Sequence, residues 1–143
     1  MGTGFMILFI SELYIIVNEE LLLMKELVSS NIYKKLAFED ILTNLDNRAS
    51  FELFIKEKEN EKIPYISFIM CDLNFLKETN DNYGHEAGDE LIKASANILN
   101  ETFKDVGKCF RLGGDEFIVV VTKENMMKAK IQELNYKISN YKR

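Results

Sequence analysis

An interruption by two glycines and two acids within an apolar stretch constrains this chain more than any other feature. Residues 110–121 read FRLGGDEFIVVV, so two β-forming runs are separated only by Gly113, Gly114, Asp115 and Glu116. Adjacent glycines supply the positive φ angles that a tight hairpin turn needs. Acids next to so much apolar sequence are costly unless they have partners. The stretch predicts a hairpin whose turn presents two carboxylates to a partner from outside the chain.

The pattern around this hairpin indicates an α/β domain. YISFIMCD, residues 65–72, is short and rich in β-formers, which predicts a buried strand ending at Asp72. Apolar stripes at helical spacing flank the strands, with a short helix or irregular segment among them. These segments are expected at 49–60, 73–84, 85–103 and 123–142. We therefore expect helices packed on a mainly antiparallel sheet.

The N-terminal residues 1–36 are expected to form a separate helical segment before a domain at 37–143. FMILFISELYIIV, residues 5–17, is short for a membrane span, which needs about 20 residues. We favour slightly a helix packed against a partner, and the alternative is the tail of a membrane segment. Apolar residues then recur at 4-3-4 spacing, which predicts a coiled-coil stalk broken near Asn31 and Lys35.

Composition and charge narrow the class of partner. The net charge of -5 argues against binding to a nucleic-acid backbone, which favours clustered cations. An anionic ligand would need metal ions or local cations to offset repulsion. Cys71 and Cys109 lie in strand-like sequence, and we interpret them as reduced core residues rather than as a disulfide. We expect a cytoplasmic protein, with a tether at the inner face of the membrane as the alternative.

Three carboxylates are expected to converge at one edge of the sheet. If the hairpin pairs beside the strand at 65–72, Asp72 approaches Asp115 and Glu116. Converging carboxylates repel unless cations lie among them, and hard oxygen ligands suit Mg²⁺ with phosphate completing its coordination. For the two hairpin acids alone, it is an equally good interpretation that they are ordinary polar residues of a turn and bind no ligand. Adding Asp72 and Lys77 favours a metal–phosphate site.

Three sequence blocks, in order, resemble the GGDEF domain family, the diguanylate cyclases. RLGGDEF at 111–117 matches the family signature letter for letter. DILTNLDNRASF at 40–51 resembles the N-terminal block, with Asn44 in place of the usual glycine, and residues 71–92 resemble the nucleotide-binding block. The resemblance covers residues 37–141. It implies an α/β (α+β) fold with a nucleotide-cyclase-like palm, whose mainly antiparallel sheet is flanked by helices and preceded by a helical stalk.

The resemblance also implies a reaction. Diguanylate cyclases condense two GTP molecules into cyclic di-GMP and release two pyrophosphates. Two Mg²⁺ ions per site, replaceable by Mn²⁺, activate the attacking hydroxyl and stabilise the leaving oxygen. Because each protomer holds one GTP, the implied enzyme is a homodimer with face-to-face sites, paired through the N-terminal helix. The alternative is an inactive GTP-binding or dimerisation module in cyclic di-GMP signalling.

Metal and catalytic roles follow from the matched positions. The resemblance makes Asp72 a metal ligand, with Leu73 contributing its backbone carbonyl. It makes Asp115 both a metal ligand and the group that deprotonates the hydroxyl, with Glu116 giving metal support. Lys77 would offset charge on the phosphates.

Substrate contacts are implied in the same way. Backbone amides around Phe75 and Leu76 would cradle the phosphate tail. Asn80 and Asp89 would read guanine, because an amide with a carboxylate complements its O6 acceptor and its N1 and N2 donors. The expected substrate-binding set is Asn80, Asp89, Phe75, Leu76, Gly113 and Gly114.

The sequence departs from the family pattern at two places. The family's product-inhibition motif, Arg-x-x-Asp, falls on Lys104 and Gly107, so we predict no such feedback site. Family members usually continue with a further strand and a last helix that carries basic residues, whereas this sequence stops at Arg143. We therefore expect a C-terminally truncated domain with an unpaired strand edge and weaker triphosphate binding.

Overall fold

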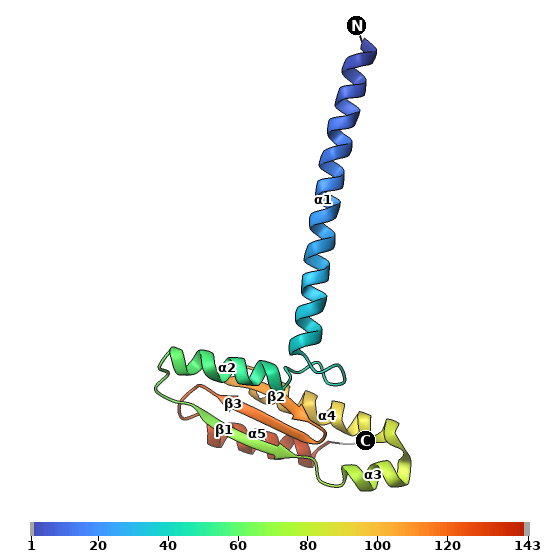
Figure 1. Cartoon of the computed structure of the whole chain (residues 1–143). Coiled ribbons are helices and arrows are strands. Elements are labelled where there is room, and N and C mark those ends of the chain that lie inside the picture. Colours follow the sequence, from blue (N-terminus) through green and yellow to red (C-terminus); the bar gives the residue numbers. More distant parts are fainter. Residues whose placement is uncertain (1, 142–143) are drawn as a thin grey trace. The chain divides into compact units, whose positions relative to one another are not determined.

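A computed structural model describes residues 2–141 of the chain, and side chains from residue 10 onward (Figure 1). One compact unit ends at Ala37 and the second begins at Phe38. The elements are α1 (Gly2–Phe38), α2 (Arg48–Asn60), β1 (Ser67–Asp72), α3 (Leu76–Tyr83), α4 (His85–Phe103), β2 (Gly107–Gly113), β3 (Glu116–Val121) and α5 (Met127–Ser139).

The first unit is the single helix α1. It runs without interruption through Asn31 and Lys35, so the expected break in the heptad pattern does not end the helix. Its apolar side chains are exposed, including Ile16, Leu23 and Leu27, each more than half accessible. Within the part of the chain that the structure describes, none of the helices combines the length and apolar character needed to cross a membrane.

The second unit is built on a three-stranded antiparallel sheet in the order β1-β3-β2. The strand expected at 65–72 begins two residues later, at Ser67. The predicted hairpin is present, and β3 lies in the middle of the sheet because it pairs with β1 on one side and β2 on the other. The mainly antiparallel sheet flanked by helices is therefore confirmed.

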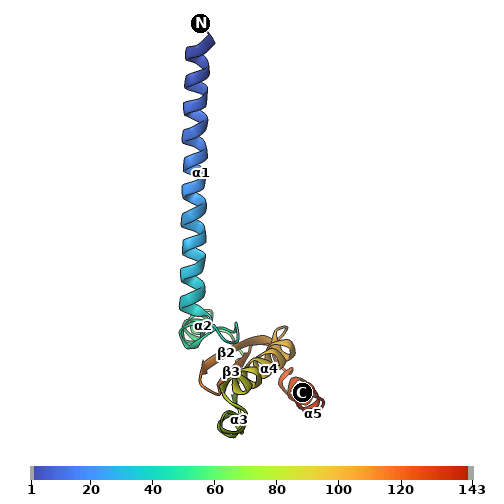
Figure 2. The same cartoon turned by 90° about the vertical axis from the view of Figure 1, so that its right-hand side faces the viewer.

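Helices cover both faces of this sheet (Figure 2). Successive side chains of a strand point to opposite faces. Phe117, Val119 and Val121 of β3 pack in one core with α4 and α5. Ile118 and Val120 pack on the other face against α2. All five side chains are buried, so β3 holds the three layers together through both faces.

β1 lies at an edge of the sheet. Among the described residues, β1 pairs with β3 alone, which leaves its other backbone edge open. Phe68 and Met70, on the face that α2 shares, are 50% and 66% exposed. β1 is therefore an edge strand that exposes apolar side chains on one face.

Candidate active site

The hairpin turn consists of Gly114 and Asp115, because β2 ends at Gly113 and β3 begins at Glu116. Gly113 and Gly114 have φ angles of 142° and 54°. A Cβ atom at either position would meet nothing within 4 Å, so backbone conformation rather than crowding requires glycine. The open space around the turn leaves room for a bulky ligand.

Two of the predicted acids lie opposite each other at the end of the sheet, and Asp115 lies in the adjoining turn. Asp72 ends β1 and is the direct cross-strand partner of Glu116. The backbone N–H of Leu73 donates a hydrogen bond of 3.2 Å to the carbonyl oxygen of Asp115. Directly paired side chains lie on the same face of a sheet, so the Asp72 and Glu116 carboxylates share a face. Both are exposed, and Asp115 is half-buried.

The oxygen donors at this edge are of the kind that bind Mg²⁺ when phosphate oxygens complete the coordination of the ion. The carboxylates of Asp72 and Asp115 and the carbonyl of Leu73 are hard oxygen ligands of the kind Mg²⁺ prefers. Among the described residues, no three Asp, Glu, His or Cys side chains are grouped closely enough to hold a metal by themselves. Mg²⁺ is commonly bound by one or two carboxylates together with phosphate oxygens and water. The chemistry of these donors is therefore compatible with Mg²⁺ when phosphate and water supply further oxygen ligands.

The segment after β1 turns sharply into α3. Phe75 precedes the helix with a φ of 66°, a left-handed conformation that non-glycine residues rarely adopt. Its carbonyl accepts the N–H of Thr79 at 2.9 Å, which closes the first turn. The N–H groups between Leu76 and Thr79 come before the first hydrogen bond of the helix and have no partner within it. Free N–H groups at the start of a helix can bind anions. The exposed Lys77 lies at the same helix end.

Asn80 and Asp89 come from neighbouring helices, α3 and α4. A Cβ atom on Gly88 would lie 2.0 Å from Oδ1 of Asn80, so the amide rests directly on the Gly88 backbone. Asp89 follows Gly88 in the chain and is exposed. The structure thus places the two predicted guanine contacts on adjacent helices. Gly88 was not among the predicted site residues, although a glycine inside a helical pattern is a signal of close packing.

A network that the sequence analysis missed fixes the hairpin turn. Nε and Nη2 of Arg111 donate to the carbonyl oxygen of Gly114 at 3.2 and 2.7 Å. Nη1 of Arg111 donates to Oδ1 of Asp40 at 2.9 Å. The same carboxylate oxygen accepts the N–H and the hydroxyl of Thr43, at 2.9 and 2.7 Å. The turn is thereby tied to the loop that begins the domain.

Burial and hydrogen bonding oppose each other at Asp40. Burial raises the pKa of this carboxyl, but the hydrogen bonds from Arg111 and Thr43 outweigh it, and the net pKa is lowered. The Arg111 side chain is only 10% exposed. A guanidinium so far from water depends on its carboxylate partner, so this pair supports the turn more strongly than a surface ion pair would.

The two cysteines take no part in the site. Cys71 and Cys109 are free thiols, as predicted, with Cys109 buried and Cys71 half-buried. Burial raises the pKa of the Cys109 thiol to about 12, with a further contribution from Cys71. Burial also raises the pKa of Cys71. Thiols with raised pKa values form little thiolate and are poor nucleophiles.

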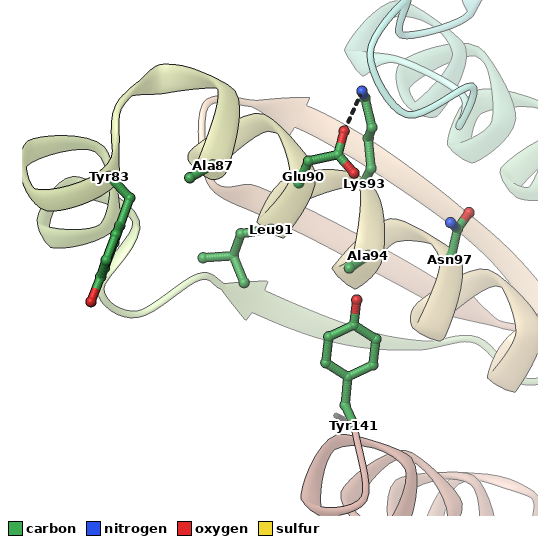
Figure 3. Close-up of a pocket in the computed structure, with 8 residues that line it drawn as sticks. All are labelled: Tyr83, Ala87, Glu90, Leu91, Lys93, Ala94, Asn97 and Tyr141. Atoms are coloured by element: carbon green, nitrogen blue, oxygen red, sulfur yellow. Dashed lines mark hydrogen bonds and ion pairs between the residues drawn. The ribbon is translucent and has the colours of Figure 1, made fainter. Parts of the chain in front are cut away.

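A cavity of about 600 Å³ lies elsewhere, beside α4 (Figure 3). Ala87, Leu91 and Ala94 form its apolar side, and a 2.8 Å ion pair between Lys93 and Glu90 lies on the same helix. The remaining lining residues are Tyr83, Asn97 and Tyr141. None of these is a predicted site residue. The acids therefore lie on an open sheet edge and not within this cavity.

The fold and the acidic hairpin define the class of protein, and the chain belongs to the GGDEF family. It matches the family described as "Diguanylate cyclase, GGDEF domain" over residues 37–142. It is 33% identical over 108 residues to diguanylate cyclase DgcS of Shewanella oneidensis, covering 71% of this chain and 36% of that protein. It is 37% identical over 101 residues to the probable diguanylate cyclase DgcT of Escherichia coli, covering 69% of this chain and 22% of that protein. The chain thus spans about a third or less of these relatives.

Solved structures share the fold. The coiled coil and GGDEF domain of DgcB from Caulobacter crescentus, in complex with c-di-GMP, has a TM-score of 0.76 at 21% identity, covering 88% of this chain and 69% of that one. A diguanylate cyclase/phosphodiesterase from Caldicellulosiruptor saccharolyticus has a TM-score of 0.63 at 26% identity, covering 71% of this chain and 65% of that one. The family and the fold inferred from the sequence are confirmed.

Proposed function

We propose that this chain is the catalytic part of a diguanylate cyclase, which condenses two GTP molecules into cyclic di-GMP and releases two pyrophosphates. The observation that carries the proposal is the pairing of Asp72 with Glu116 beside the glycine turn. This pairing puts a strand-end carboxylate and two hairpin acids at one sheet edge, in a chain of the cyclase family. Such an edge suits metal-assisted transfer of a nucleotidyl group.

Asp72, Asp115 and the carbonyl of Leu73 would hold two Mg²⁺ ions or their Mn²⁺ substitutes, with Glu116 in support. When bound, the metal neutralises phosphate charge and polarises the attacking 3′-hydroxyl. Asp115 would accept the proton of that hydroxyl on its carboxylate, because the turn holds it beside Leu73. Lys77 would neutralise phosphate charge from the start of α3, where the amides near Phe75 and Leu76 would bind phosphate oxygens.

Guanine would bind between α3 and α4. The amide of Asn80 can donate to O6, and the carboxylate of Asp89 can accept from N1 and N2. Adenine presents the opposite pattern of donors and acceptors along this edge, so it would leave these groups unpaired. The amide of Asn80 packs directly against the backbone of Gly88, and this contact limits the rotation of the amide and favours one orientation.

Two protomers are needed for one product, since each would hold one GTP. The exposed apolar residues of α1 supply a surface that a second copy of the helix would bury. Pairing through α1 would raise the effective concentration of one half-site for the other. Free, reduced cysteines and a GTP substrate favour a location in the cytoplasm.

The test is product formation by the full chain with GTP and Mg²⁺, followed by chromatography. We expect cyclic di-GMP from the native chain. Asp115→Ala should lower the rate about 10²- to 10⁴-fold, the usual effect of losing a general base. Glu90→Gln, an exposed acid on α4 outside the site, is the matched control and should retain the native rate. Tight GTP binding by a folded dimer that forms no product would contradict the enzyme and indicate a binding module.

A further inference from the structure

Arg48 lies at the acidic edge and has no role in the reaction described above. It is the first residue of α2, directly after the N-cap Asn47, whose side chain accepts the N–H of Ser50 at 3.1 Å. The loop before it is tied to β2, because the N–H of Arg111 donates to the carbonyl of Asp46 at 2.9 Å. The start of α2 is therefore fixed relative to the hairpin.

From this position Arg48 spans both strands of the hairpin. Its Nε donates to the carbonyl oxygen of Leu112 on β2 at 3.3 Å. Its Nη2 lies 3.9 Å from Oε2 of Glu116 on β3. Leu112 is the extra residue where the register shifts between Arg111 and Gly113. The bulge turns a carbonyl toward Arg48, which anchors the guanidinium beside Glu116.

Glu116 therefore has two competing partners. It is the cross-strand neighbour of Asp72, so its carboxylate can turn toward a cation held by Asp72 and Asp115, or toward Arg48. The Arg48 and Glu116 side chains are 59% and 51% exposed, so the free-energy difference between the two arrangements is small. A small difference of this kind can be reversed by the binding of a divalent cation with its phosphates.

We infer that Arg48 is a positioning residue that holds the Glu116 carboxylate toward α2 and weakens divalent-cation binding by the acidic edge in the absence of nucleotide. Metal would then enter the site together with the triphosphate. This inference rests on the proposed function, because it assumes that these carboxylates bind the metal. It agrees with the finding that no three acidic or other metal-ligating side chains cluster among the described residues.

The test is binding of Mn²⁺ alone to the full chain at low ionic strength, with free Mn²⁺ measured by electron paramagnetic resonance. Arg48→Gln should raise the affinity about twofold to fivefold, the range expected for an exposed ion pair. In the Glu116→Gln background the same change should have little effect, because Arg48 acts through Glu116. Lys93→Gln removes an equal charge from α4 and should leave the affinity unchanged. Circular dichroism verifies that each variant is folded.

Two failures are distinguishable. The inference is overturned, while the metal site stands, if Arg48→Gln has the same affinity for Mn²⁺ as the native chain. It is also overturned if Arg48→Gln raises that affinity as much in the Glu116→Gln background as in the native chain. If neither the native chain nor Arg48→Gln binds Mn²⁺ alone, the inference is overturned, because removal of Arg48 then has no effect on metal binding. If Asp72→Asn and Asp115→Asn each bind Mn²⁺ in the presence of GTP as well as the native chain does, the metal assignment of the proposed function fails and the inference fails with it.

Discussion

Replacing Asp40 by asparagine should destabilise the second unit, because it removes the charge that faces a nearly buried guanidinium. Asp40 accepts three hydrogen bonds, one from Arg111 and two from Thr43. Asparagine keeps an acceptor oxygen of similar shape, so the loss is mainly the charge assistance. Bonds to charged groups contribute about 1.5–3 kcal/mol against about 1 kcal/mol for neutral ones, a difference of about 0.5–2 kcal/mol per bond. The two bonds from Thr43 become neutral in Asp40→Asn, which gives a loss of about 2 kcal/mol. Asp40→Ala, which leaves Arg111 unpaired, should cost about 3 kcal/mol or more.

The free energy of unfolding in urea, followed by circular dichroism at neutral pH, measures this loss. Glu90→Gln is the matched control, since it neutralises an exposed acid and should change stability by less than about 0.5 kcal/mol. The pKa of Asp40 is lowered below its ordinary value of 3.8, so its stabilisation is complete above that pH and is lost as pH falls through the folded-state pKa. The gap between native chain and Asp40→Asn should therefore shrink in acid. A loss no larger than that of Glu90→Gln would refute the reasoning.

Three further outcomes are expected. Gly88→Ala would place a Cβ 2.0 Å from Oδ1 of Asn80, so it should lower stability by about 1–3 kcal/mol and weaken GTP binding in calorimetry; unchanged GTP affinity would contradict the role of Asn80. Asn44 has a φ of 57°, so Asn44→Ala should be about 1 kcal/mol less stable in urea than Asn44→Gly, and equal stabilities would contradict this. Alkylation at about pH 8, followed by mass spectrometry, should modify Cys109 at least about 100-fold more slowly in the folded chain than in the unfolded chain, because its pKa is about 12; comparable rates would contradict its burial.

Local patterns were sufficient to predict most of the second unit. The helix expected at 49–60 is α2, which begins one residue earlier at Arg48. The adjacent glycines predicted the hairpin because positive φ angles are a property of the glycine backbone itself. Pairing of the hairpin beside β1, which brings Asp72 opposite Glu116, was only a condition of the sequence interpretation, because α3 and α4 separate β1 from the hairpin and local patterns do not dictate which strands pair. The left-handed φ of Asn44 agrees with the usual glycine at that position of the family block.

The interactions that support the turn could not be predicted, because they depend on side-chain directions in the folded unit. Arg111 and Asp40 are separated by 71 positions, and nothing in the two residue types says that they pair. Arg48 reaches the hairpin only because a bulge turns the Leu112 carbonyl toward it. The predicted N-terminal helix is present, and it continues through Asn31 and Lys35. A change of heptad register there alters which face of the helix is apolar, but it introduces no glycine or proline that would end the helix.

The most direct test of the central claim uses Asp72, because this residue reaches the acidic edge from β1, whereas Asp115 and Glu116 belong to the hairpin. Cyclic di-GMP formation from GTP and Mg²⁺ should be compared between the native chain and Asp72→Asn, with both dimeric and folded. We predict that product formation falls at least about 100-fold in Asp72→Asn, as expected when a ligand of the catalytic metal is lost. A folded Asp72→Asn dimer that forms product at the native rate would contradict the convergence of these carboxylates on one reacting nucleotide.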